Sequence, residues 1–239
     1  MDIAVFETIA VHYGKPVFLH THLDRMEHSL RCLAPDEIFE RDDLCREIIE
    51  RAKNKNDIAL KAVWSKEGPI FYQRGNPYRD IDYHRGIDIC LGETILDETD
   101  PLRFHKTTNR EIFDTERKKA AKQGYKEVIF TNRKGHITEG SVSNLFCVKS
   151  GKILTPPISD GLLNGIMRRF LLALYPKEIE ETVITEKDLF EAEEIFLTNS
   201  LMGVLPVCSL EGKRYLTGGK GTAISHRYKA LIETLATEK

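Results

Sequence analysis

Thr138–Phe146 (TEGSVSNLF) and His105–Arg110 (HKTTNR) are the two stretches that decide how this chain is read. In the first, Glu139 stands at the end of an apolar strand and precedes small residues, which let a flat ligand approach the backbone. In the second, Lys106 stands in a short polar segment between a predicted strand and a predicted helix. Together they predict a carboxylate and an amine that serve one site.

An amine and a carboxylate are the protein groups that pyridoxal 5'-phosphate (PLP) needs most. The amine of Lys106 can form a Schiff base, and desolvation beside the cofactor would lower its pKa. The carboxylate of Glu139 can keep the pyridine nitrogen protonated, so that the ring accepts electrons from a substrate. For each residue taken alone, an ordinary surface side chain is the alternative.

Three further features could bind a phosphate. Gly161–Arg168 ends a loop and begins a helix, where free N–H groups and the helix dipole favour an anion. Thr198–Ser200 follows a predicted strand and offers hydroxyl and backbone donors. Arg25 lies near the edge of an apolar helical stripe, where an inward-facing guanidinium would need an anion. An ordinary helix start, a polar turn and a solvated arginine are the alternatives.

The composition excludes several classes of protein. The 239 residues are 41% hydrophobic and 30% charged, with a net charge of −2 and no basic stripe for nucleic acid. No apolar run reaches the roughly 18–20 residues of a membrane span, and the N-terminus lacks a signal-peptide pattern. The five cysteines show no metal spacing. We expect a cytoplasmic protein with reduced thiols, no metal, and no nucleic-acid or membrane partner.

The hydrophobic pattern predicts a mixed α/β or α+β fold in two halves, each a β-sheet or small barrel with flanking helices. Residues 1–99 form the N-terminal half, in which Ile87–Leu91 is expected to be a strand of the same sheet as the earlier strands. Residues 100–107 are the linker that carries the lysine. Residues 108–239 form a C-terminal half that binds the cofactor.

The five segments that carry the candidate site residues, taken in their order along the chain, resemble the fold-type IV PLP enzymes. This group includes branched-chain aminotransferases, D-amino acid aminotransferases and 4-amino-4-deoxychorismate lyases. The resemblance covers nearly the whole chain, from Phe6-Glu7-Thr8 to Pro206-Val207-Cys208. It implies PLP as the cofactor, a small-molecule substrate and a homodimer. The cofactor-binding residues that it implies are Lys106 for the Schiff base, Glu139 for the pyridine nitrogen, and Arg25, Gly165, Ile166, Met167, Asn199 and Ser200 for the phosphate.

Within this family, several details are similar to the lyases. They are the Lys106-x-x-Asn109-Arg110 pattern, Met167 where aminotransferases more usually carry threonine, and Thr8, which lies near the substrate in the lyase pattern. The resemblance therefore implies conversion of 4-amino-4-deoxychorismate to 4-aminobenzoate and pyruvate, a step towards folate. The implied catalytic residues are Lys106, Glu139 and Thr8. The candidates for binding the substrate or its carboxylates are Asn109, Arg110, Arg79 and Arg168.

Two other functions stay open at this point. One is a class IV aminotransferase that acts on branched-chain or D-amino acids, and the other is a non-catalytic protein that retains the fold. The chain begins almost at Phe6-Glu7-Thr8, without the N-terminal segment that single-domain members of the family usually carry. This resembles lyase domains fused to a chorismate-amidating synthase, and it implies a functional link with such a synthase.

Overall fold

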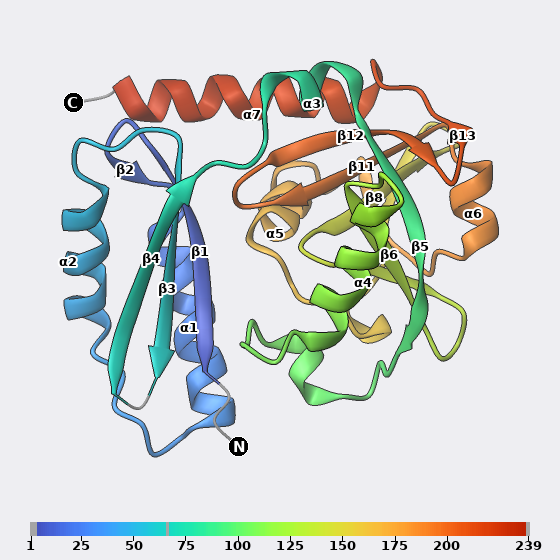
Figure 1. Ribbon diagram of the computed structural model, residues 1–239. Coiled ribbons are helices and arrows are strands. Elements are labelled where there is room, and N and C mark those ends of the chain that lie inside the picture. Colours follow the sequence, from blue (N-terminus) through green and yellow to red (C-terminus); the bar gives the residue numbers. More distant parts are fainter. Residues whose placement is uncertain (1–3, 66, 238–239) are drawn as a thin grey trace. The chain divides into compact units, whose positions relative to one another are not determined.

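Residues 4–65 and 67–237 are described in a computed structural model of the chain, apart from the side chains of residues 235–237. They divide into two units (Figure 1). Unit 1 contains the chain up to Tyr78, the short segment His105–Asn109 and the C-terminal end from Ala230. Unit 2 contains Arg79–Phe104 and Arg110–Lys229. No helix in the described part of the chain is long and apolar enough to cross a membrane.

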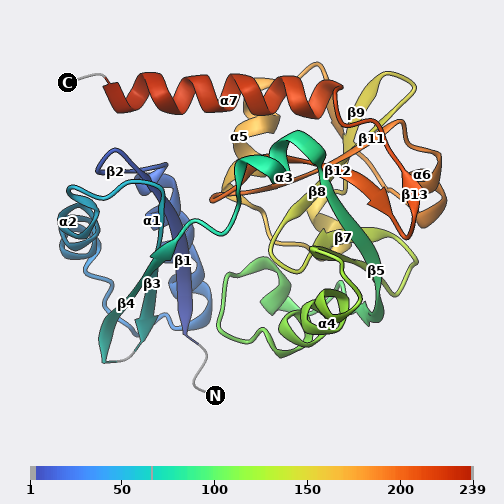
Figure 2. The same cartoon turned by 45° about the horizontal axis from the view of Figure 1, so that its top comes forward.

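Unit 1 is built on an antiparallel sheet whose described strands have the order β2-β1-β3-β4. These strands are β1 Val5–His12, β2 Lys15–Pro16, β3 Ile58–Ser65 and β4 Gly68–Gly75. Two helices, α1 Leu19–Leu33 and α2 Arg41–Ala52, lie beside the strands (Figures 1 and 2). Side chains alternate along a strand, so one face of the sheet carries the inward residues of β1 and β3. These residues form one hydrophobic cluster with the helices, which includes Val5, Ile9, Leu60, Trp64, Leu23, Met26, Leu44 and Ile48.

Unit 2 is built on a larger sheet that closes on itself. Its described strands are β5 Ile87–Leu96, β6 Glu127–Asn132, β7 Ile137–Gly140, β8 Asn144–Lys149, β9 Lys152–Thr155, β10 Ile179–Glu181, β11 Glu194–Asn199, β12 Gly203–Leu210 and β13 Lys213–Arg214. Neighbouring strands follow the order β10-β9-β8-β11-β12-β5-β6-β7, and β7 also pairs with β8. The strands from β8 to β7 along this path therefore form a closed barrel, in agreement with the predicted fold class.

Several helices accompany the barrel strands (Figure 1). They are α3 Asp80–Arg85, η1 Pro101–Phe104, α4 Glu111–Lys122, η2 Ile158–Asp160, α5 Ile166–Leu174, α6 Glu186–Glu191 and α7 Lys220–Thr237, the last of which continues into unit 1. The sequence predicts one helix over Glu111–Gln123, ended by Gly124, and another over Gly165–Tyr175, ended by Pro176. The structure confirms both helices to within one residue at each end. The end of β7, at Glu139, and the start of β8, at Asn144, lie near the loop that leads into α5.

The prediction that Ile87–Leu91 belongs to the first sheet is wrong. β5 lies in unit 2, where it pairs in parallel with both β6 and β12. The local pattern of an apolar strand does not specify its partner, because pairing depends on packing against segments far along the chain. The units consequently differ from the predicted halves: residues 79–104 belong with the C-terminal barrel, whereas the lysine segment His105–Asn109 returns to unit 1.

Candidate active site

The predicted site residues divide between the two units. Unit 1 carries Thr8, Arg25, Lys106 and Asn109. Unit 2 carries the others, which are Arg79, Arg110, Glu139, Gly165, Ile166, Met167, Arg168, Asn199 and Ser200.

Lys106 is held at the edge of the unit 1 sheet by its own backbone. Its carbonyl accepts a hydrogen bond from the Phe6 N–H at 2.9 Å, and the Thr108 N–H donates to the Ala4 carbonyl at 2.8 Å. Val5 and Thr107 form an antiparallel bridge between these two bonds. The segment thus acts as an extra edge beside β1, which fixes the position from which the half-buried Lys106 side chain extends.

The amine of Lys106 lies beside an aromatic ring that a second lysine also approaches. Lys106 Nζ is 4.7 Å from the centroid of the Phe6 ring, and Lys61 Nζ is 4.2 Å from the same centroid. Lys61 pairs directly with Thr8 across β1 and β3, so Thr8, Phe6 and Lys61 project from the same face of the sheet. Thr8 and Lys106 therefore share the surroundings of Phe6, whereas Asn109 is exposed.

A buried ion pair joins β1 to α1 on the opposite face of the sheet. The Glu7 side chain is 1% exposed, and its carboxylate accepts hydrogen bonds from Arg25 Nε at 2.7 Å and Arg25 Nη2 at 2.6 Å. Nδ1 of the buried His22 lies 2.6 Å from the same carboxylate. Burial alone would raise the pKa of Glu7, but Arg25 and His22 outweigh it and lower the pKa to about 2. Within unit 1, Glu7 is the anion that the inward-facing Arg25 requires.

Sequence reasoning missed the partnership of Glu7 with His22 and Arg25. The signal was present, because Glu7 stands at an inward position of β1 between Val5 and Ile9, and a buried carboxylate needs a cationic or hydrogen-bonding partner. Burial lowers the pKa of His22, and the charge of Lys106 adds to this effect. The Glu7 cluster and the predicted Schiff-base lysine are therefore electrostatic neighbours within unit 1.

In unit 2, three buried polar side chains form a row across three neighbouring strands. Glu139 on β7 pairs with Asn144 on β8, and Asn144 pairs with Thr198 on β11. Directly paired residues project to the same face of a sheet, so the three side chains are neighbours. Thr198 is 1% exposed, and its Oγ1 has no hydrogen-bond partner within the described chain. A buried hydroxyl without a partner is costly, which points to a ligand at this face.

The loop before α5 lies over this row. The Leu163 N–H donates to Glu139 Oε2 at 3.2 Å, and the Leu163 carbonyl accepts from Asn144 Nδ2 at 2.9 Å. Any Cβ at Gly165 would collide with Asn144 Oδ1, although the φ of Gly165 is −62°. Glycine is therefore required at this position because of the close approach of Asn144 and not because of an unusual backbone conformation.

The N-terminus of α5 supplies backbone donors beside the row. Gly165 is the N-cap residue, and among the described residues no side chain caps the helix. The N–H groups of the first turn are consequently available to an anion, which the helix dipole also favours. The side chains of Ile166 and Met167 are buried, so these two residues would contact such an anion through their backbone.

The turn after β11 is shaped by Asn199. Its Oδ1 accepts hydrogen bonds from the Leu201 and Met202 N–H groups, both at 2.9 Å, and its Nδ2 donates to the Val142 carbonyl at 3.1 Å. The side chain of Asn199 thus organises the backbone around the half-buried Ser200. Direct contacts of Asn199 and Ser200 with a cofactor stay predictions.

Arg110 lies beside the predicted carboxylate. Its Nη2 donates to the Ser141 carbonyl, its Nε is 3.8 Å from Asp114, and its guanidinium lies 5.0 Å from the centroid of the Phe113 ring. Burial lowers the pKa of Arg110, while nearby acids that include Glu139 act in the opposite direction. The guanidinium is thus within the electrostatic field of Glu139.

The other two arginines have contrasting surroundings. Arg79 is exposed at the start of α3. Arg168 is fully buried, where its guanidinium donates to the Pro156 carbonyl at 2.8 Å and contacts Asn164 and Glu181. Arg168 therefore fastens the loop that precedes α5 to the helix itself.

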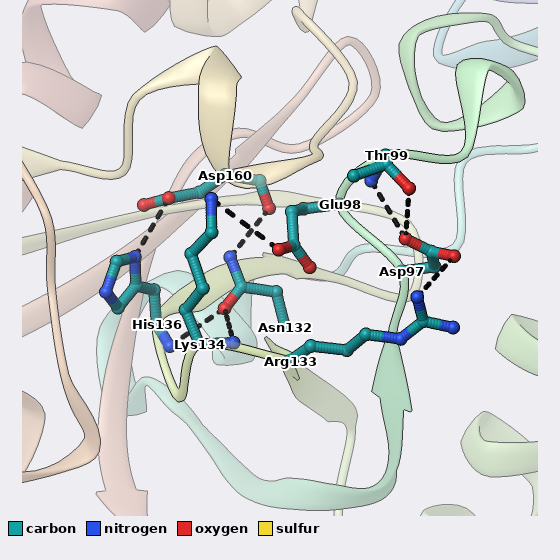
Figure 3. Close-up of polar contacts among 8 residues, drawn as sticks. All are labelled: Asp97, Glu98, Thr99, Asn132, Arg133, Lys134, His136 and Asp160. Carbon is teal, nitrogen blue, oxygen red and sulfur yellow. Dashed lines mark hydrogen bonds and ion pairs between the residues drawn. The ribbon is translucent and has the colours of Figure 1, made fainter.

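A second polar cluster holds that loop from the other end (Figure 3). Asn132 Nδ2 donates to the Asp160 carbonyl at 3.1 Å, and His136 Nδ1 lies 2.9 Å from Asp160 Oδ1. A Cβ at Gly161, whose φ is +83°, would lie 2.5 Å from the Cα of Glu98. The β6–β7 turn, η2 and the segment after β5 are thereby packed together, which orients both β7 and the loop before α5.

The family model for class IV aminotransferases matches residues 4–210. The chain belongs to the class IV aminotransferase family. It is 32% identical to a D-alanine aminotransferase of Bacillus licheniformis, in an alignment that covers 98% of this chain and 88% of the relative. It is 24% identical to the aminodeoxychorismate lyase of Bacillus subtilis, with 99% and 88% covered. The predicted family resemblance is confirmed.

The fold is shared with solved structures of class IV enzymes. A branched-chain amino acid aminotransferase from Thermobaculum terrenum, solved in its PLP-form, superposes with a TM-score of 0.83 at 21% identity, over 97% of this chain and 85% of that chain. The relatives include both aminotransferases and a lyase. Membership of the family therefore establishes the kind of enzyme fold without choosing between the two reactions.

Proposed function

We propose that this class IV protein is a PLP-dependent lyase that converts 4-amino-4-deoxychorismate to 4-aminobenzoate and pyruvate. The observation that carries PLP binding is the row Glu139-Asn144-Thr198 beside the uncapped N-terminus of α5. It combines a buried carboxylate, a buried hydroxyl that has no hydrogen-bond partner among the described residues, and the first-turn N–H groups of a helix without a side-chain cap in the described chain. These are donors and acceptors that suit a pyridinium and a phosphate on one flat molecule.

Each part of the cofactor has a candidate partner. The backbone N–H groups of Ile166, Met167 and Ser200 would bind the phosphate, together with Arg25, whose guanidinium is oriented by Glu7. Glu139 would accept the hydrogen bond from the pyridine N–H. Lys106 would provide the amine that holds the cofactor covalently.

When bound, PLP supplies an electron acceptor for the carbon next to the substrate nitrogen. Glu139 would keep the pyridine proton in place, and its carboxylate is one of the acids whose charge acts on the nearby Arg110. The amine of Lys106, once it is not bound to the cofactor, would be the base that removes the proton from the substrate ring carbon next to the amino nitrogen. Thr8 positions the substrate or delivers a proton near the departing enolpyruvyl group. Aromatisation of the ring makes the elimination favourable.

The sequence pattern supports the lyase over the aminotransferase. Met167 occupies a position at which aminotransferases of the family more usually carry threonine, so this position offers no hydroxyl to the phosphate. The Asn109-Arg110 pair follows Lys106 at the spacing seen in the lyase pattern. A chorismate-amidating synthase would supply the substrate, and we propose that the enzyme works as a homodimer.

One comparison favours the second candidate, an aminotransferase that acts on D-amino or branched-chain amino acids. The identity of 32% to a D-alanine aminotransferase exceeds the 24% to the lyase. Both reactions use the same lysine and the same carboxylate, so the residues described above serve either one.

The two reactions differ in their need for a second substrate. A lyase completes its cycle with aminodeoxychorismate alone and should release 4-aminobenzoate and pyruvate in equal amounts over many turnovers. Leucine or D-alanine with 2-oxoglutarate should then give little or no glutamate. Steady glutamate formation without 4-aminobenzoate would assign the aminotransferase reaction. A colourless protein that binds no PLP and has neither activity would point to the non-catalytic alternative.

A further inference from the structure

Glu127, at the start of β6, is a buried carboxylate that serves one turn of the barrel. Its side chain is 3% exposed. Oε1 accepts hydrogen bonds from the N–H of Ser141, at 3.0 Å, and from its hydroxyl. Oε2 accepts from the Val142 N–H at 3.2 Å and from the Ser143 hydroxyl at 3.0 Å. Four donors of the segment Ser141–Ser143, which we name the 141–143 turn, therefore converge on this carboxylate.

Gly140 makes this convergence possible. A Cβ at Gly140 would collide with the Ser143 hydroxyl and would lie 3.1 Å from Cδ of Glu127. The Gly140 N–H instead donates to the Ser143 carbonyl at 2.7 Å, which closes the turn. A larger residue at this position would push the turn away from Glu127.

Two other side chains hold the carbonyl groups of the same turn. Arg110 donates to the Ser141 carbonyl, and Asn199 donates to the Val142 carbonyl at 3.1 Å. Glu127 accepts hydrogen bonds from N–H and hydroxyl groups of the turn, and Arg110 and Asn199 donate to its carbonyl groups, so both the donors and the acceptors of the turn are engaged. Its two ends are β7 with Glu139 and β8 with Asn144.

We propose that Glu127 is a positioning residue that fixes the 141–143 turn and thereby holds Glu139 and Asn144 in the geometry needed for PLP. The proposal rests on the proposed function for its ligand. Glutamine cannot replace the carboxylate, because its one oxygen cannot serve four donors and its NH₂ group would face donors of the turn. The nearby positive charge of Arg110 would also lose a counter-ion.

Glu127→Gln is the test, and Glu194→Gln is its matched control. Glu194 is 2% exposed, and its carboxylate accepts backbone hydrogen bonds from the start of α7, including those from Lys220 and Gly221 at 2.7 Å, instead of bonds from the 141–143 turn. Hydrogen exchange of the apo-protein, followed by mass spectrometry, should become at least tenfold faster in peptides that span 139–145 for Glu127→Gln only. Titration of the apo-protein with PLP should show at least tenfold weaker binding for Glu127→Gln only.

Equal exchange in the 139–145 peptides of the wild type and Glu127→Gln, or equal effects of the two substitutions, would overturn the proposal. If Glu127→Gln does not fold, Ser143→Ala provides a second test, because it removes one of the four donors of the turn. It should raise hydrogen exchange in the 139–145 peptides about threefold, since a typical hydrogen bond contributes roughly 0.5–1.5 kcal/mol. No increase in exchange would overturn the proposal. Failure of the wild type to bind PLP would instead refute the proposed function, and the exchange measurement would still decide the role of Glu127.

Discussion

Arg25→Met should destabilise the protein by about 3–5 kcal/mol, because it leaves the carboxylate of Glu7 buried without its main cationic partner. The pKa of Glu7 provides an independent magnitude. Burial raises this pKa, but Arg25 and His22 together lower it from 4.5 to about 2, a net change of about 3 kcal/mol at neutral pH, at about 1.4 kcal/mol per pH unit, for both partners combined. For a chain of this size each kcal/mol lowers Tm by about 2–4 °C, so Tm should fall by roughly 6–20 °C.

The pH dependence has a definite sign. The pKa of Glu7 is lower in the folded state than its ordinary value, so its stabilisation is fully present above about pH 5. It is lost as the pH falls through the interval from about 4.5 to 2. The wild type should therefore lose this contribution in that interval, whereas a protein without the Glu7 carboxylate should not.

The double variant Glu7→Gln/Arg25→Met separates the ion pair from general packing. It removes both charges with little change in volume, so it should recover most of the stability lost in Arg25→Met. Thermal and urea unfolding of the apo-protein, followed by circular dichroism, should give a coupling free energy of at least about 2 kcal/mol. Arg46→Met is the control, because the Asp43–Arg46 pair is exposed and should contribute less than about 1 kcal/mol.

A free energy of unfolding for Arg25→Met within about 1 kcal/mol of the wild-type value would refute a stabilising Glu7–Arg25 ion pair. A double variant as unstable as Arg25→Met would refute it as well. A stable double variant also allows the phosphate role of Arg25 to be measured without a folding defect. Weaker PLP binding in that variant would support a phosphate contact, since charge-assisted hydrogen bonds contribute about 1.5–3 kcal/mol each. Unchanged affinity would leave Arg25 with its structural role alone.

Three further outcomes are expected. Borohydride reduction should attach the cofactor to the peptide that contains Lys106, and Lys106→Ala should abolish this adduct. Lys61→Ala should retain the adduct, although Lys61 Nζ lies 4.2 Å from the centroid of the Phe6 ring. An adduct on Lys61 would contradict the assignment of Lys106. The Glu139→Gln variant should still bind PLP, but its single-turnover rate should be about 10²–10⁴-fold lower. An unchanged rate would show that Glu139 is not needed to keep the pyridine nitrogen protonated. Sedimentation should show a homodimer. A monomer that retains activity would contradict the proposal that the enzyme works as a homodimer.

The sequence alone determined several local elements and the family, and it predicted the chemical character of the site. The ends of the helices Glu111–Lys122 and Ile166–Leu174 follow from Gly124 and Pro176, residues that end helices through local effects over a few positions. The choice of Lys106 and Glu139 followed from residue type and flanking sequence, and the family resemblance that they indicated is confirmed.

Only the tertiary structure decided which distant segments meet. β5 joined the barrel through β6 and β12, against the prediction, because strand pairing depends on packing between remote segments. Glu127 and Glu7 looked like ordinary strand residues until the fold placed donors from other elements around them. Gly165 resembled a simple helix start, yet it is required by the approach of Asn144 from another strand. Such contacts depend on burial and space in three dimensions, which periodicity along the chain does not encode.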